Sequence, residues 1–125
     1  MDDRVTHIGP VAVVVHTESD GVLITSVKGE VDQDSVEVVR AELATGLDRR
    51  PTALVVDLDG VEFFGSLGIT ALLEAWERAA RLGVGFAVAA SRRPALRTLE
   101  VTDMVEVLRV RRTIQEALVL ARSAA

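Results

Sequence analysis

Cysteine and tyrosine are absent from the sequence, which has one lysine (Lys28), one tryptophan (Trp76) and two histidines, His7 and His16. The lack of cysteine excludes disulfide scaffolds, thiol catalysis and cysteine-based zinc or iron–sulfur sites. Both histidines lie near the amino end, so the chain offers few candidates for a general base. No apolar run reaches the roughly 18 residues of a membrane span, and Met1–Arg4 lacks the features of a signal peptide. These absences predict a cytoplasmic protein with no cofactor, no metal site and no membrane segment.

The chain has 125 residues and a formal net charge of −5, which fits one acidic domain. A net negative charge repels phosphate backbones, so we expect no direct nucleic-acid binding. The charge is unevenly distributed along the chain. Residues 1–62 carry 13 acids and 5 bases (net −8), and residues 63–125 carry 6 acids and 9 bases (net +3). This difference has two possible explanations. The charges are placed by chance on a solvated surface, or they form a polarised surface that orients a partner.

Hydrophobic spacing and turn residues divide the chain into alternating strands and helices. The predicted strands are Val11–Val15, Val22–Val27, Ala53–Leu58, Val84–Ala90 and Val105–Val107. The predicted helices are one capped by Asp32 or Asp34 with apolar positions Val36, Val39, Leu43 and Leu47, then Ser66–Leu82, Pro94–Leu99 and Thr113–Ala121.

This alternation predicts an α/β fold with a mixed, mostly parallel sheet. The turn-like residues Glu18–Gly21 join the first two strands into an N-terminal antiparallel hairpin. We expect four to five strands and about four helices in one domain over residues 11–122, with tails at 1–10 and 123–125. Partners and ligands of such folds bind at the carboxyl ends of the strands. The segment 59–66, between the central strand and the long helix, is therefore the predicted functional loop.

Two enzyme motifs can be tested against this loop. Residues Phe64–Gly68 resemble the nucleophile turn of serine hydrolases, but that motif needs glycine at the position of Phe64 and a histidine late in the chain. A phosphate-binding loop needs a lysine directly after its last glycine, and the only lysine is Lys28. The sequence therefore predicts that the protein is not an enzyme.

Acidic residues at the end of the central strand suggest two further sites. Asp57 lies where a phosphoaspartate receiver has its acceptor, but the lysine that receivers have after their last strand is missing. Asp57, Asp59 and Glu62 could supply oxygens to a hard cation. Aspartate is common in turns for its own hydrogen bonding, and this simpler explanation is favoured.

Ser66 has two interpretations. A serine at the start of a helix usually accepts an amide hydrogen bond as a cap, which is worth about 1 kcal/mol. The same position suits a phosphoserine, because the free N–H groups and positive end of the helix favour a phosphate. The modification adds a charge of about −1.5 to −2. It would change any interface built on the neighbours Leu67, Gly68 and Ile69, which we expect to be exposed.

Two segments of the chain resemble the STAS-domain anti-sigma-factor antagonists of bacteria. The first is Gly29-Glu-Val-Asp32, after the second predicted strand, and the second is the strand–loop–helix segment Val55–Ile69. The family pattern in the second segment is Asp-Ser-Ser/Thr-Gly-Leu, with the first serine as phosphoacceptor. That serine aligns with Ser66, the glycine with Gly68 and the leucine with Ile69. The resemblance covers roughly residues 11–122 and implies the STAS fold.

The resemblance also implies a mechanism. The unphosphorylated antagonist would bind an anti-sigma factor that is a serine kinase of the GHKL type, which releases a sigma factor for transcription. The kinase would phosphorylate Ser66 with ATP and switch the antagonist off, and a serine phosphatase would reset it. Such partner switching is typical of stress responses. The partner surface would comprise Asp32, Gly65, Leu67, Gly68 and Ile69, and the oligomeric state is left open.

The sequence departs from the family pattern at two positions. Gly65 stands where the family commonly has aspartate, and Leu67 where it has serine or threonine. Glycine adds backbone freedom beside the acceptor, and leucine makes the helix start more apolar. The alternative is therefore a STAS scaffold or interaction module that works without regulatory phosphorylation.

Overall fold

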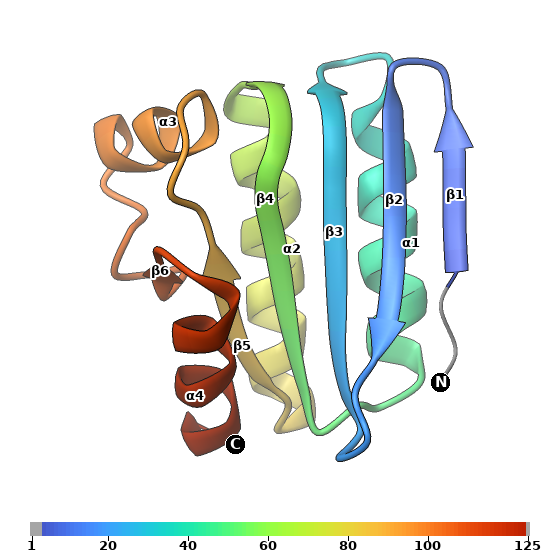
Figure 1. Cartoon of the computed structure of the whole chain (residues 1–125), viewed down its shortest axis with the longest axis vertical. Helices are drawn as coiled ribbons and strands as arrows, with labels where there is room; N and C mark the ends of the chain where they lie inside the picture. The colour runs from blue at the N-terminus through green and yellow to red at the C-terminus, as the bar shows by residue number, and fades with distance from the viewer. Residues whose placement is uncertain (1–3, 125) are drawn as a thin grey trace.

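Figure 1 shows the computed structural model of the chain, which describes residues 4–124. The strands are β1 (Arg4–Ile8), β2 (Val11–Thr17), β3 (Val22–Val31), β4 (Ala53–Phe64), β5 (Gly85–Ala89) and β6 (Val110–Arg111). The helices are α1 (Val36–Asp48), α2 (Ser66–Leu82), α3 (Ala95–Val101) and α4 (Ile114–Ala124). None of these helices is long and apolar enough to cross a membrane.

The strands form one mixed sheet in the order β1-β2-β3-β4-β5-β6. The pairs β1–β2 and β2–β3 are antiparallel, and the pairs from β3 to β6 are parallel. Helices α1 and α2 cover one face, whereas α4 lies on the opposite face over β4 and β5 (Figure 1). The predicted α/β fold, with its N-terminal hairpin and four helices, is confirmed, but the sheet has six strands where four to five were expected.

The central strand β4 is buried on both faces. Leu54 and Val56 belong to the large core beneath α1 and α2. Ala53 and Val55 belong to a smaller core that α4 covers with Ala117 and Ala121. All four β4 side chains are fully buried. An unbroken apolar run is what a strand between two helical layers requires, which is why the sequence prediction located it.

Both predicted tails contain secondary structure. Residues 4–8 of the predicted N-terminal tail form β1, which pairs with β2 along its whole length. Arg4 and Thr6 both bind the carboxylate of Glu42 on α1, with a Thr6 Oγ1 to Glu42 Oε2 distance of 3.0 Å. At the other end, α4 extends to Ala124. The prediction missed β1 because it relied on apolar runs, and this edge strand contains polar residues. Contacts of Arg4 and Thr6 with α1 help to hold it in place.

Two predicted elements were misplaced. The segment 59–66 was expected to be a loop, but β4 continues to Phe64 by pairing with an equally extended β3. The strand predicted at Val105–Val107 is wrong, because these residues form turns. The last strand is instead β6, which the hydrogen bond from Val110 N–H to Val105 C=O brings beside β5 (2.8 Å).

Helix α2 has the predicted bounds, Ser66 to Leu82. It ends because Gly83 adopts a left-handed conformation (φ 72°), as glycine readily does. Near its start, Gly68 packs against Phe64, the last residue of β4. A Cβ atom on residue 68 would lie 2.5–2.9 Å from three atoms of the Phe64 ring. The absence of a side chain at this position therefore lets α2 begin directly against the end of β4.

Helix α4 is fixed at both ends. Thr113 Oγ1 accepts the N–H of Glu116 (3.0 Å) as a helix cap, and the Glu116 carboxylate accepts the N–H of Arg112 (3.2 Å). Near the other end, Arg122 Nε donates to Asp20 in the β2–β3 turn (2.7 Å). This bond lowers the pKa of Asp20 below its ordinary value of 3.8 and raises the pKa of Arg122.

The contact between Gly68 and Phe64 predicts the effect of adding one carbon atom. Overpacking a core site costs about 1–3 kcal/mol, and the better helix propensity of alanine returns up to about 1 kcal/mol. We therefore expect Gly68→Ala to lower the free energy of unfolding in urea by about 1–2 kcal/mol. The exposed control Thr70→Ala on the same helix should change it by less than about 0.5 kcal/mol. A Gly68→Ala variant as stable as the wild type would contradict this packing.

The Asp20–Arg122 pair predicts a pH-dependent contribution to stability. Because the folded state lowers the pKa of Asp20, this contribution is present above pH 3.8 and is lost as the pH falls through the folded pKa. Thermal unfolding should show Asp20→Asn melting below the wild type at about pH 7 and together with it at about pH 2. Glu100→Gln, which removes an exposed carboxylate outside any ion pair of the described residues, is the control. If Asp20→Asn still melts at a lower temperature than the wild type at about pH 2, the pair does not act through ionisation.

Candidate functional site

Ser66 is the first residue of α2 and lies at the carboxyl edge of the sheet, directly after the junction with β4. Its side chain is exposed. The residue before the helix is Gly65, so no side chain caps α2. Within the described residues, the Ser66 hydroxyl makes no hydrogen bond; only its carbonyl oxygen is used, by Thr70 Oγ1 (3.2 Å). Ser66 therefore does not act as the cap that serine usually supplies at a helix start.

The amino end of α2 favours a negative group. The helix has 17 residues, and its first turn contains no acidic residue. Gly65 C=O accepts the N–H of Gly68 (3.0 Å), while the N–H groups of the first positions point out of the helix, as in any helix without a side-chain cap. The positive end of the helix dipole is thus not neutralised within the first turn, where its effect is strongest.

Asp32 lies across from Ser66 in the loop between β3 and α1. Its Oδ1 accepts the N–H groups of Asp34 (2.9 Å) and Ser35 (3.1 Å). Ser35, the residue before α1, is buried; its hydroxyl donates to Glu30 C=O (2.6 Å) and accepts the N–H of Asp32 (3.0 Å). Helix α1 has no side-chain cap, so the prediction that Asp32 or Asp34 caps it is wrong. Asp32 Oδ1 instead binds two N–H groups that precede the helix, which fixes the loop and leaves the second oxygen for a partner.

Between Asp32 and Ser66 lies an open hollow of about 280 Å³, whose apolar side is formed by Phe63 and Leu67. These two large side chains are 52% and 42% exposed. We call Asp32, Phe63, Gly65, Ser66 and Leu67 the Ser66 surface. Its volume is at the lower limit of small-molecule pockets, and exposed apolar groups beside polar ones are typical of a protein contact.

The structure separates the residues predicted for this site. Asp32, Gly65 and Leu67 lie together around Ser66. The expectation that Gly68 and Ile69 are exposed is wrong, because both are buried. Gly68 faces the Phe64 ring and Ile69 belongs to the main core. Both positions follow from helical geometry, since residues 68 and 69 turn towards the sheet when residues 66 and 67 face solvent.

Gly65 does not use the conformational freedom of glycine. Its backbone is extended (φ −103°, ψ −167°), which any residue adopts. A Cβ atom here would lie 3.5 Å from the Phe63 ring, an ordinary contact distance. The aspartate of the family pattern would therefore fit at this position without rearrangement.

Phe63 was missed by the sequence prediction. Its side chain points to solvent, whereas that of its neighbour Phe64 is buried. A signal was present, because adjacent strand residues face opposite sides and Phe63-Phe64 cannot both enter one core.

The other polar residues near the strand ends have structural roles. Asp57 accepts from Ser26 Oγ (3.2 Å) and from Asp59 N–H (3.1 Å). Asp59 in turn accepts the N–H groups of Ser91 (2.7 Å) and Arg92 (3.2 Å), which fixes the chain after β5. Within residues 4–124, no group of three or more histidine, aspartate or glutamate side chains is arranged to hold a metal ion.

No described base is placed to activate Ser66 as a nucleophile. His16 lies near the end of β2, beside the β2–β3 turn at the opposite end of the sheet (Figure 1). Its Nε2 lies 2.8 Å from Glu18 Oε2, a local hydrogen bond two residues along the chain.

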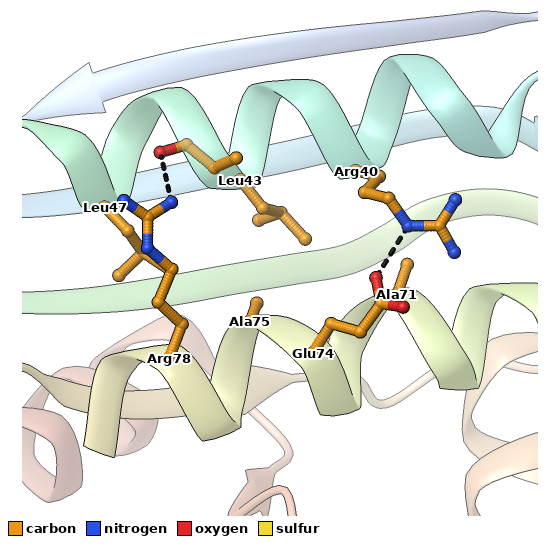
Figure 2. A pocket seen from close by; sticks show the side chains of 8 residues that line it. Arg40, Leu43, Leu47, Ala71, Glu74, Ala75 and Arg78 are labelled. Carbon is orange, nitrogen blue, oxygen red and sulfur yellow. Dashed lines mark hydrogen bonds and ion pairs between the residues drawn. The ribbon is translucent and has the colours of Figure 1, made fainter. Parts of the chain in front are cut away.

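A second cavity, of about 100 Å³, lies between α1 and α2 (Figure 2). Small residues, Ala71 and Ala75, form its α2 side. Two arginines span it: Arg40 Nε donates to Glu74 (2.6 Å), and Arg78 donates to Ala44 C=O (3.2 Å). The cavity is too small for an ordinary ligand, so we interpret it as a packing gap that the arginines bridge.

Comparisons with known proteins agree with this architecture. A family model described as "STAS domain" matches residues 14–117. The anti-sigma-F factor antagonist RsfB of Mycobacterium tuberculosis is 30% identical over 105 residues, covering 84% of this chain and 85% of RsfB.

Solved structures give the same result. The crystal structure of an anti-sigma factor antagonist from Mycobacterium paratuberculosis superposes with a TM-score of 0.82 at 29% identity, covering 90% of this chain and 94% of that one. Unphosphorylated SpoIIAA, an anti-sigma factor antagonist, shares the fold (TM-score 0.72) at 15% identity over 90% of this chain and 98% of its own. The match over residues 14–117 and the similarity to RsfB show that the chain belongs to the STAS domain family, among the anti-sigma-factor antagonists.

Proposed function

We propose that this protein binds an anti-sigma factor with serine kinase activity through the Ser66 surface, thereby releasing a sigma factor, and that phosphorylation of Ser66 ends the binding. The observation that carries the proposal is the exposed Ser66 hydroxyl, which forms no hydrogen bond with any described residue and lies beside two exposed apolar side chains, Phe63 and Leu67. The similarity to RsfB, named an anti-sigma-F factor antagonist, supports the class of partner.

The unmodified surface suits a protein contact. Phe63 and Leu67 supply apolar anchors whose burial is favourable by roughly 25 cal/mol per Å². Asp32 supplies a carboxylate that its own loop already orients, so little entropy is lost when a donor of the partner binds it. Gly65 has no side chain to cover its backbone, so a partner can approach the start of α2 closely.

Phosphorylation would change this surface while leaving the fold intact. The kinase transfers the γ-phosphoryl group of ATP to Ser66 Oγ, and the hydroxyl proton leaves. The phosphate adds about two negative charges and would have to lose water to enter a contact with Phe63 and Leu67. It gains the N–H groups and dipole of α2, so the modified protein stays folded. A serine phosphatase resets the cycle, and the nucleotide is bound by the partner. This is a cytoplasmic switch of the kind used in stress responses.

A second candidate function is a STAS interaction module without a switch. Two observations favour it: Gly65 removes the acid beside the acceptor, and Leu67 replaces a hydroxyl residue with an exposed apolar one. In that case the same surface binds a partner at all times, and Ser66 is only a small residue that fits the contact.

Substitutions of Ser66 distinguish the two functions. We expect Ser66→Asp to weaken binding to the cognate kinase by about tenfold or more without lowering the melting temperature, because the carboxylate is stabilised at the helix start. Ser66→Ala should bind within about threefold of the wild type and should not be phosphorylated when incubated with kinase and ATP. Mass spectrometry locates the phosphate, and Ser19→Asp in the distant β2–β3 turn is the control. Phosphate on another residue, or equal binding by both Ser66 variants, would contradict the switch.

Truncation of the apolar anchors tests the surface itself. Phe63→Ala and Leu67→Ala should each weaken kinase binding by about tenfold or more, because anchors near the centre of a contact carry most of its energy. Stability should change less than for a core truncation, since both side chains are about half exposed. Val119→Ala on α4, where the side chain is 69% exposed on the other face of the sheet, should bind like the wild type in calorimetry. Equal affinities for all variants would place the contact elsewhere.

A further inference from the structure

Three arginines, Arg92, Arg93 and Arg97, follow the edge of β4 that β5 leaves uncovered. The pairing of β4 with β5 ends at Asp57 and Ala89, whereas β4 continues to Phe64. The chain after β5 runs along this free edge and is attached to it twice. Asp59 accepts the N–H groups of Ser91 and Arg92, and Thr98 Oγ1 donates to Phe64 C=O (2.7 Å). We call Arg92, Arg93 and Arg97 the arginine ridge.

The arginine ridge is exposed and not neutralised. All three side chains are solvent-exposed. In the described part of the chain, Arg92, Arg93 and Arg97 take part in no ion pair. Five of the other ten arginines form ion pairs among the described residues: Arg4, Arg40, Arg78, Arg81 and Arg122. Three unpaired guanidinium groups within six residues therefore give this edge of β4 a concentrated positive charge.

The opposite side of β4 carries the opposite charge. There, β3 and its following loop present Glu30, Asp32 and Asp34, and we call these three residues the acidic lip. None of them forms an ion pair among the described residues, and Glu30 is the register neighbour of Phe63. Because β4 lies between β3 and β5 in the sheet, Ser66 at its end lies between the acidic lip and the arginine ridge.

We propose that the arginine ridge binds an acidic surface on the same partner that contacts Phe63 and Leu67, and that the lip and the ridge together orient this partner. The inference rests on the proposed function and extends it by assigning a charge pattern to the partner: basic groups towards the lip and acidic groups towards the ridge. A nucleic acid does not fit, because its phosphates would approach the acidic lip of a chain with net charge −5.

The separation of the two charged strips suits steering. The acidic lip and the arginine ridge lie on opposite sides of β4, and with neighbouring strands about 4.8 Å apart they are separated by about 10 Å, more than the Debye length of about 8 Å at physiological ionic strength. The lip and the ridge therefore act on an approaching partner as two separate charges. Only one orientation brings the partner's basic groups to the lip and its acidic groups to the ridge. Charges at the rim of a contact act mainly on the association rate and its salt dependence.

The experiment compares two doubly substituted proteins with equal change in charge. Arg93→Glu/Arg97→Glu reverses the ridge, and Arg49→Glu/Arg50→Glu reverses two exposed arginines that lie outside ion pairs of the described residues, at the opposite end of the sheet. Stopped-flow association with the cognate anti-sigma kinase is measured at about 50 and about 500 mM salt. We expect the ridge variant to associate about tenfold more slowly at low salt and within about twofold of the wild type at high salt. The control should stay within about twofold at both.

Each other outcome overturns the inference. If the ridge variant associates at the wild-type rate, or if the control slows as much as the ridge variant, the ridge does not bind the partner. The proposed function still stands in that case, because the wild type binds the kinase. If the ridge variant associates equally slowly at both salt concentrations, its fold has changed, and Arg93→Gln/Arg97→Gln is measured instead. This variant should associate about threefold more slowly at low salt and like the wild type at high salt. The same rate as the wild type at low salt overturns the inference. Self-association of the wild type that the ridge variant lacks would assign the ridge to a second copy. If the wild type does not bind the kinase, both proposals fail.

Discussion

Leu54 and Val56 project from β4 into the core beneath α1 and α2, while Ala53 and Val55 project into the core beneath α4. Burial of this one strand on both faces constrains the rest of the molecule. It fixes the plane of the sheet, and the close contact of Gly68 with Phe64 then fixes where α2 begins relative to the strand end. Ser66 is thereby held at a rigid junction. The position of Ser66 depends on the packing of β4 and α2 and not on bonds made by its own side chain.

The unequal lengths of the strands explain why the molecule is polarised. β4 has 12 residues and β5 has five, so the second half of β4 is paired on only one side. The paired side brings the acidic residues of the β3–α1 loop to Ser66, and the unpaired side is covered by the arginine-bearing segment after β5. The net charges of −8 and +3 in the two halves of the sequence thus correspond in part to opposite flanks of one surface.

The sequence was sufficient where the local signal and the tertiary packing agree. Ser66–Leu82 has helical apolar spacing and a terminal glycine, and its bounds agree with the prediction. It was insufficient where pairing with a distant strand overrides local signals, as at Asp59-Gly60, which resemble a turn yet lie within β4. For the candidate site, the sequence predicted Asp32, Gly65, Ser66 and Leu67, which lie together in the structure, and also Gly68 and Ile69, which are buried. It could not separate exposed from buried apolar neighbours, because the face of a helix or strand is decided by what packs against it.

The Ser66 hydroxyl forms no bond within the described chain, and this has a consequence for how such a protein evolves. A hydroxyl that takes no part in holding the fold can be removed with little loss of stability. Selection for stability alone therefore does not preserve Ser66. Related chains can gain or lose a modifiable serine by a single substitution and keep the same architecture, so signalling behaviour can diverge quickly among proteins whose folds remain nearly identical.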